Sequence, residues 1–290
     1  MWKKGISVII LSAMVISLVS MAMIFMNDLG RNVKAGSEDE IEEVAETIYV
    51  IPGPVVVSSD APEITSYDEA RQYVQKYADE HGIDIGIYPE DLINMLANNP
   101  ETYQFVCEYP RYKGVNTVED ITGDLYGGGV PLFLQWDIRW GYKDYGSNMM
   151  ALTGCGPTCL SMVASYLLDD PSLTPSEVAR FAEENGYYDT EYGSGTLWTL
   201  MSEGAEQLGL RSEEVPLEKE TMLAVLESGQ PLILSMGPGA FTSEGHFIVI
   251  SGTVNGQFRV NDPNSIERSS RLWDYEEIED QVQAIWTFSA

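Results

Sequence analysis

The order of secondary-structure signals along residues 130–290 constrains the fold more than any other feature of the chain. Apolar residues at helical spacing and clear caps predict helices at Gly154 to Leu168, Thr174 to Gly186, Leu197 to Leu208 and Glu218 to Ser228. Strand patterns follow at Pro231 to Met236, His246 to Thr253, Gln257 to Asp262 and Ala284 to Phe288. Because the helices precede the strands and do not alternate with them, the pattern predicts an α+β domain, with a helical half packed on an antiparallel sheet.

Two further segments are expected between the N-terminal region and this domain. Residues 27–60 carry an acidic run and several prolines with little hydrophobic periodicity, which is typical of a linker. Residues 61–126 contain helical patterns at Ser66 to Gly82, Pro89 to Ala97 and Thr102 to Cys107, the last ending near Pro110. They are interpreted as a small helical subdomain, separated from residues 130–290 by the glycine run 127–129.

The N-terminus has the pattern of an export signal. Lys3 and Lys4 precede the stretch from Gly5 to Met26, which contains no charged residue and is long enough to cross a bilayer core. Residues 1–26 are therefore expected to be a signal or a transmembrane anchor, with the rest of the chain outside the cell. Cleavage after Ala22 or Ala35 would give a secreted product, and an uncleaved single-pass anchor is equally compatible with the pattern.

Composition excludes several classes of function. The chain has 45 acidic against 16 basic residues and a net charge of −29, which argues against a nucleic-acid partner. Its three cysteines and two histidines include no paired CxxC or HxxxH element that could supply the four ligands of a structural zinc. No metal and no cofactor is expected.

Cys155 is the candidate nucleophile. A thiol reacts as the thiolate, and a helix N-terminus lowers its pKa; Cys155 lies at such a start, between Gly154 and Gly156 and just before Pro157. Cys159, one turn further along, is expected in the apolar core, where burial raises the pKa of a thiol. Cys107 is interpreted as a buried thiol as well.

His246 is the candidate base, since it is the only histidine after residue 130. It opens an apolar strand directly after the glycine-containing segment 237–245, which places it at the mouth of the strand. The other histidine, His81, lies beside Gly82 at a helix end and is interpreted as a solvated or capping imidazole.

Asp262 can orient His246 only in one register of the hairpin formed by the strands at 246–253 and 257–262. A two-residue turn at Asn255 and Gly256 would pair Asp262 with Val249, on the face away from His246. A three-residue loop with Gly256 in a G1 bulge pairs Asp262 with Ile248 on the His246 face. It also puts Val260 opposite Ile250 and Arg259 opposite Ser251. This second register separates apolar from polar residues better, and we predict it.

Thiol acyl transfer also needs an amide donor for the developing oxyanion, and Gln135 is the candidate. The segments Pro131 to Gln135, Gly154 to Thr158, Gly245-His246 and Asn261 to Pro263, in this order, resemble papain-like cysteine peptidase family 39. The resemblance covers about residues 130–290. It implies a papain-like fold, the triad Cys155, His246 and Asp262, and an oxyanion hole containing Gln135.

The resemblance has two departures that bear on the substrate. Members that remove double-glycine leaders from bacteriocins have the glutamine only a few residues before the cysteine, and they are fused to a transporter ATPase. Here a longer segment separates Gln135 from Cys155, and the chain has no Walker motif. The chain therefore resembles the exported, stand-alone relatives, and the leader-peptide substrate is not carried over.

The leading hypothesis is an extracytoplasmic thiol hydrolase that cleaves a peptide or amide bond in a peptide or protein substrate. Membrane contact is expected through the N-terminal segment only. Amide transfer or cell-wall amide cleavage would use the same chemistry, and a non-catalytic peptide-binding module could keep the same fold. A thiol redox pair of Cys155 and Cys159 is disfavoured, because their spacing differs from the CxxC of such proteins.

Overall fold

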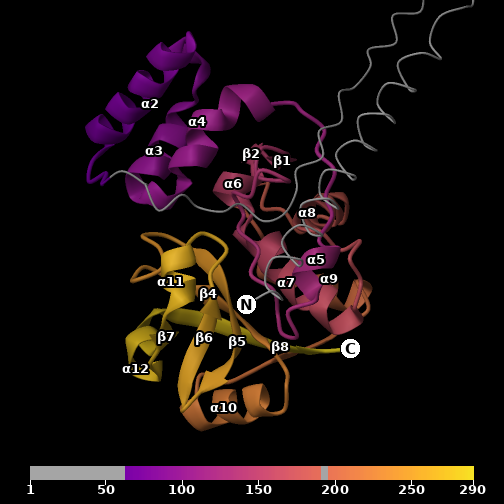
Figure 1. Ribbon diagram of the computed structural model, residues 1–290. Helices are drawn as coiled ribbons and strands as arrows, with labels where there is room; N and C mark the ends of the chain where they lie inside the picture. Colours follow the sequence, from indigo (N-terminus) through magenta and orange to yellow (C-terminus); the bar gives the residue numbers. More distant parts are fainter. Residues whose placement is uncertain (1–62, 191–194) are drawn as a thin grey trace, which may run out of the picture. The chain divides into compact units, whose positions relative to one another are not determined.

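The computed structural model describes residues 63–190 and 195–290 (Figure 1). The segments predicted as signal or anchor (1–26) and as linker (27–60), together with residues 61 and 62 of the predicted subdomain, lie outside the described residues. Within the described ranges, no helix combines the length and apolar character needed to cross a membrane.

Three helices open the described chain, as the sequence predicts. They are α2 (Tyr67–His81), α3 (Glu90–Asn98) and α4 (Tyr103–Tyr112), with short 3-10 turns η1 (Ile85–Ile87) and η2 (Pro100–Thr102) and a single-turn α5 (Thr122–Leu125). The side chain of Ser66 caps α2 by accepting a hydrogen bond from the Glu69 amide, and Gly82 ends it with a φ of 67°. The helix α4 ends at Tyr112, with Pro110 in its last turn, in agreement with the expected end near Pro110.

The apolar faces of these three helices pack against one another and also against a later segment of the chain. Their cluster includes Leu92, Leu96 and Phe105 from the helices, and it also includes Leu134 and Trp136 from the segment that carries Gln135. The division into 61–126 and 130–290 stays a prediction, but the apolar core crosses that boundary. The position of residues 134–136 therefore depends on the helices that precede them.

Helices again dominate the next part of the chain. They are α6 (Met150–Thr153), α7 (Cys155–Leu168), α8 (Pro175–Glu184), η3 (Trp198–Leu200), α9 (Glu203–Gln207) and α10 (Lys219–Glu227). The Thr174 hydroxyl caps α8 by accepting from the Glu177 amide, as predicted. The single helix expected from Leu197 to Leu208 is wrong, because the backbone leaves the helical region at Ser202. This break lets Gly204 approach Leu200 so closely that a Cβ would lie 2.8 Å from its Cδ1.

A six-stranded sheet follows, and every neighbouring pair in it is antiparallel. Its order is β3-β8-β4-β5-β6-β7, with β3 (Arg211–Glu214), β4 (Leu232–Met236), β5 (His246–Val254), β6 (Gln257–Asn261), β7 (Leu272–Trp273) and β8 (Val282–Ser289). A separate hairpin pairs β1 (Asp144–Tyr145) with β2 (Asn148–Met149). Between β6 and β8 the chain forms α11 (Ile266–Ser270), α12 (Tyr275–Ile278) and η4 (Glu279–Gln281). The four predicted strands are present. The short strands β1, β2 and β7 were not predicted, and neither was β3, whose four residues are polar and show no apolar alternation.

Both faces of the central strands are buried. Ile233, Val249 and Trp286 belong to the cluster that contains the apolar side of α7, and α7 contacts β5 directly. Leu234 and Ile248 belong to the opposite cluster with residues of α10. Figure 1 shows the strands with helices around them. The predicted α+β architecture, helices followed by an antiparallel sheet, is confirmed.

Candidate active site

Cys155 is the first residue of α7 and is partly exposed. The glycines beside it are required by close packing. A Cβ on Gly154 would lie 2.5 Å from the Met150 carbonyl oxygen, and one on Gly156 would lie 2.5 Å from the Thr196 hydroxyl oxygen. Burial raises the pKa of the Cys155 thiol, but a hydrogen bond and charge from His246 outweigh it, together with backbone hydrogen bonds from Phe247 and Gly156. The pKa of Cys155 therefore lies below the ordinary thiol value.

His246 is the first residue of β5, and 8% of its side chain is exposed. Its Nε2 lies 2.8 Å from Oδ1 of Asp262, so Nδ1 is the ring nitrogen left for the hydrogen bond with Cys155. Burial lowers the pKa of His246, but the charge and hydrogen bond of Asp262 and the contact with Cys155 raise it to about 10. The imidazole is therefore held as a cation between the Cys155 sulfur and the Asp262 carboxylate.

Asp262 follows β6 and is completely buried. Its Oδ1 also accepts a hydrogen bond from the Asn264 amide at 2.8 Å, and its Oδ2 accepts one from Nε of Arg268 at 2.5 Å. Burial raises the pKa of Asp262, and the charges and hydrogen bonds of His246 and Arg268 outweigh that effect, so the net pKa is lowered. Asp262 is therefore ionised at neutral pH.

The predicted turn of the β5–β6 hairpin is wrong, although the predicted face of Asp262 is right. Asn255 and Gly256 have φ angles of 54° and 82° and form a two-residue turn, in place of the predicted three-residue loop. Val254 is paired with Gln257. A bulge then falls at residue 251, so Arg259 pairs with Gly252 and not with Ser251.

The bulge shifts the register by one residue on one strand. Beyond it Ile250 pairs with Val260, as predicted, and Val249 pairs with Asn261. Asp262, the next residue, thereby reaches the His246 face and its imidazole. The extra residue that produces this register is Ser251 in β5, and not a third residue in the turn.

Gln135 forms hydrogen bonds with the segment that follows Asp262 and with α6, the helix that precedes Cys155. Its backbone amide donates to the carbonyl of Pro263 at 2.7 Å, and its side-chain Nε2 donates to the carbonyl of Ala151 in α6 at 2.7 Å. The residue is 5% exposed, and its side-chain Oε1 has no hydrogen-bond partner. Because an amide nitrogen carries two N–H groups, the bond to Ala151 occupies one and leaves the other available to an oxyanion.

The remaining thiols and the second histidine lie where the sequence places them. Cys159 is fully buried, and burial raises its pKa well above the ordinary value. Cys107 is also buried, which raises its pKa to about 12. His81 is exposed at the end of α2, where its Nδ1 lies 2.8 Å from the Tyr77 carbonyl oxygen. Only Cys155 among the three cysteines has the environment of a nucleophile.

Arg268 and Asn264 are contacts of the site that the sequence did not predict. Asn264 belongs to the turn after Asp262, which the run Asp262-Pro263-Asn264 could have indicated. Arg268 lies on α11, and Ser265, whose hydroxyl accepts from the Arg268 amide, marks the start of that helix. A short helix of five residues has too little periodicity to be recognised from sequence.

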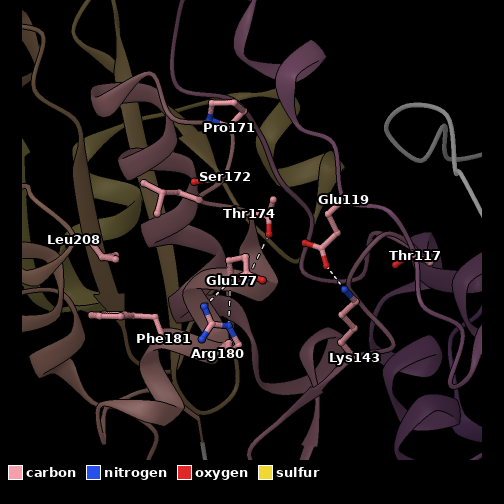
Figure 2. Close-up of a pocket in the computed structure, with 11 residues that line it drawn as sticks. Thr117, Glu119, Lys143, Pro171, Ser172, Thr174, Glu177, Arg180, Phe181 and Leu208 are labelled. Carbon is pink, nitrogen blue, oxygen red and sulfur yellow. Dashed lines mark hydrogen bonds and ion pairs between the residues drawn. The ribbon is translucent and has the colours of Figure 1, made fainter. Parts of the chain in front are cut away.

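A separate cavity of about 620 Å³ lies beside α8 and contains none of these residues (Figure 2). Its charged groups are paired with one another: Lys143 with Glu119, and Arg180 with Glu177. Among the described residues, no group of three or more His, Cys, Asp or Glu side chains is placed to hold a metal ion. The only contiguous set of nucleophile, imidazole and carboxylate identified in residues 63–190 and 195–290 is that of Cys155, His246 and Asp262.

Comparison with known proteins places this domain in a family. Residues 128–288 match the model of the Peptidase_C39 like family. The peptidase domain of Streptococcus ComA, described as a bifunctional ABC transporter involved in a quorum-sensing pathway, is similar at 20% identity, with a TM-score of 0.36. That match covers 47% of this chain and 90% of the other. A protein from Bacillus anthracis described as a C39-like peptidase is similar at 15% identity, with a TM-score of 0.39, over 56% of this chain and 94% of the other. No curated protein matches this chain. Because the family model covers more than half of the residues, the chain belongs to the Peptidase_C39 like family, as its motifs predicted.

Proposed function

We propose that this chain is a cysteine peptidase that cleaves a peptide or amide bond in a peptide or protein substrate. The observation that carries the proposal is the contact chain from Cys155 through His246 to Asp262, with the 2.8 Å bond between the last two. Family membership supports peptidase chemistry. In this mechanism the Cys155 thiolate attacks the carbonyl carbon, and the imidazolium of His246 gives a proton to the leaving amine. Water then hydrolyses the thioester, with neutral His246 taking a proton from it.

The direct test uses purified protein and a peptide library, with products identified by mass spectrometry. A peptidase gives cleaved products, and a thiol-specific peptidyl electrophile blocks both cleavage and Cys155. A non-catalytic peptide-binding module would bind peptides without cleaving them. An amide-transferring enzyme would give products joined to an added amine, and a cell-wall amidase would release fragments from peptidoglycan and leave linear peptides intact. Either of these last outcomes would keep the thiol chemistry and change the substrate class.

Gln135 provides a test of oxyanion stabilisation in particular. Gln135→Ala removes the amide donor, so we expect kcat to fall by roughly 10²- to 10³-fold, the usual cost of losing one oxyanion-hole donor. Alkylation of Cys155 by iodoacetamide forms no oxyanion, and its rate should stay close to that of the unaltered protein. If alkylation falls in parallel with kcat, Gln135 acts on the position of Cys155 and not on the oxyanion.

We also propose that the enzyme acts outside the cytoplasm, held by residues 1–26 or secreted after their cleavage. The uncharged stretch from Gly5 to Met26 behind two lysines supports this location. Deleting residues 1–60 should leave the protein in the cytoplasm with unchanged turnover, because the proposed site residues all lie after residue 130. Cell fractionation and a turnover assay check both parts. A truncated chain that is folded but inactive would show that residues 1–60 are more than a tether.

A further inference from the structure

Both oxygens of the Asp262 carboxylate form hydrogen bonds with charged side chains. Oδ1 faces Nε2 of His246 at 2.8 Å, while Oδ2 accepts a hydrogen bond from Nε of Arg268 at 2.5 Å. The Asp262 side chain is completely buried, and one quarter of the Arg268 side chain is exposed. A carboxylate held at both oxygens cannot rotate unless one of these charged hydrogen bonds breaks. The direction in which Asp262 points therefore depends on where α11 places Arg268.

The start of α11 is held in turn by a residue from the N-terminal helices. Glu101, in η2 between α3 and α4, accepts hydrogen bonds from the Ser265 hydroxyl at 2.5 Å and from the Ile266 amide at 2.7 Å. The Glu267 amide lies 3.3 Å from the same carboxylate. One carboxylate thus satisfies three donors at the first turn of a helix that contains only five residues.

A second contact from the same turn holds the other end of the loop. Nδ2 of Asn99 donates to the carbonyl of Asn264 at 2.5 Å, and the indole N–H of Trp136 donates to the same oxygen at 3.1 Å. Asn99 itself is 7% exposed, so this contact is largely shielded from water. Residues 262–268 are consequently fixed by η2, a part of the chain outside the segment that matches the family model.

We propose that Glu101 and Arg268 are positioning residues: Glu101 holds α11 so that Arg268 keeps the carboxylate of Asp262 directed at His246. Glu101 acts on Arg268 through the first turn of α11, where it accepts from the Ile266 amide, and Arg268 and the imidazolium each pair directly with the Asp262 carboxylate. The consequence for turnover rests on the proposed function. The consequence for His246 itself does not, because it concerns only which groups surround the ring.

The sign of one pKa shift separates positioning from a simple charge effect. The ionisable groups that face His246 and Asp262 are Cys155 and Cys159 on α7 and Arg268 on α11. If Arg268 acted only as a nearby cation, its removal would leave Asp262 in place and raise the pKa of His246. If Arg268 positions Asp262, its removal lets the carboxylate turn away, and the pKa of His246 falls.

The experiment is a histidine NMR titration of the full chain, which has only two histidines. In Arg268→Met and in Glu101→Gln, we expect the pKa of His246 to fall by about one unit or more from its elevated value. His81 is exposed on α2 and lies outside this contact path, so its resonance identifies by contrast the one that belongs to His246. The matched controls are Arg271→Met, which removes an arginine that pairs with Glu277, and Glu108→Gln, which removes a carboxylate that bonds Tyr77. Neither control should move His246.

The double variant Arg268→Met with Glu101→Gln tests whether the two residues act in series. Residues in one path give a shift no larger than that of Arg268→Met alone, whereas independent effects add. An unchanged or raised pKa of His246 in Arg268→Met, with the spectrum of a folded protein intact, overturns the proposal. Full additivity removes Glu101 from it. Because the titration needs no substrate, lowered pKa values without any peptide cleavage would refute the proposed function and leave this inference standing. Cleavage with an unmoved His246 would do the reverse.

Discussion

Replacing Cys155 by alanine should abolish both peptide cleavage and alkylation by iodoacetamide near neutral pH. Cys155 is the only one of the three cysteines with a lowered pKa, because it alone has His246 and the backbone of Phe247 and Gly156 beside its sulfur. Cys107 and Cys159 are buried thiols with raised pKa values and have little thiolate to react. Mass spectrometry after a short exposure to iodoacetamide should therefore find a single modified residue in the unaltered protein and none in Cys155→Ala.

Cys159→Ala is the matched control, one helical turn away on the same helix. It removes one buried sulfur atom among apolar neighbours, so we expect a loss of about 1 kcal/mol in the free energy of unfolding with labelling and turnover retained. Chemical denaturation measures the first and the assays above measure the second. If labelling instead survives in Cys155→Ala and disappears in Cys159→Ala, the nucleophile lies one turn further into α7.

Replacing His246 by alanine should also abolish turnover and strongly slow alkylation, in this case by raising the pKa of the Cys155 thiol. The thiolate of Cys155 then loses its hydrogen bond and its cationic neighbour, while the burial that raises its pKa remains. The pKa of the thiol should therefore rise, and alkylation at pH 6 should slow strongly, since the rate follows the fraction of thiolate. Turnover should fall to background, because both proton transfers lose their group. Alkylation rates measured from pH 5 to pH 10 check the prediction, and an unchanged profile would contradict it.

The same variant should also change how stability depends on pH. The folded-state pKa of His246 is raised, so its contribution to stability is present below the unfolded-state pKa and is lost as the pH rises through about 10. The pKa of Asp262 is lowered, so its contribution is present above the unfolded-state value and is lost as the pH falls. The difference in unfolding free energy between the two proteins should therefore be largest at mildly acidic pH, between the unfolded-state pKa values of about 4 for the aspartate and about 6.5 for the histidine, and should shrink toward both extremes. His81→Ala, which replaces an exposed imidazole outside the site, is the control for the removal of a histidine.

The three residues of the proposed triad differ in the structure that carries them. Cys155 is fixed by α7 and by two glycines that permit no side chain, and His246 is fixed by its pairing to Met236 in β4. Asp262 is the member carried by a loop, and its direction is set by contacts from several segments. Variation in that loop would be expected to change activity without disturbing the thiol itself.

Features that depend on residues close together in the chain can be predicted from the sequence of this protein. The glycines and proline around Cys155 specify a helix start within a few positions, and the order of helices and strands specifies an α+β domain. The motifs around Gln135, Cys155, His246 and Asp262 together were enough to predict the family. The face of Asp262 was also predicted correctly, because apolar alternation constrains which side of a strand is buried.

How Asp262 reaches that face, and which residues hold it there, depends on packing between segments that are distant in sequence. The two-residue turn at Asn255 and Gly256 satisfies local turn preferences, and a bulge at residue 251 corrects the register, since the buried face of β6 must still meet that of β5. Glu101 meets Ile266 across more than 160 positions of chain, and nothing near either residue in sequence indicates the contact. Such contacts depend on the helices of residues 67–112 packing against Leu134 and Trp136, and that packing arises only when separate segments bury their apolar faces together.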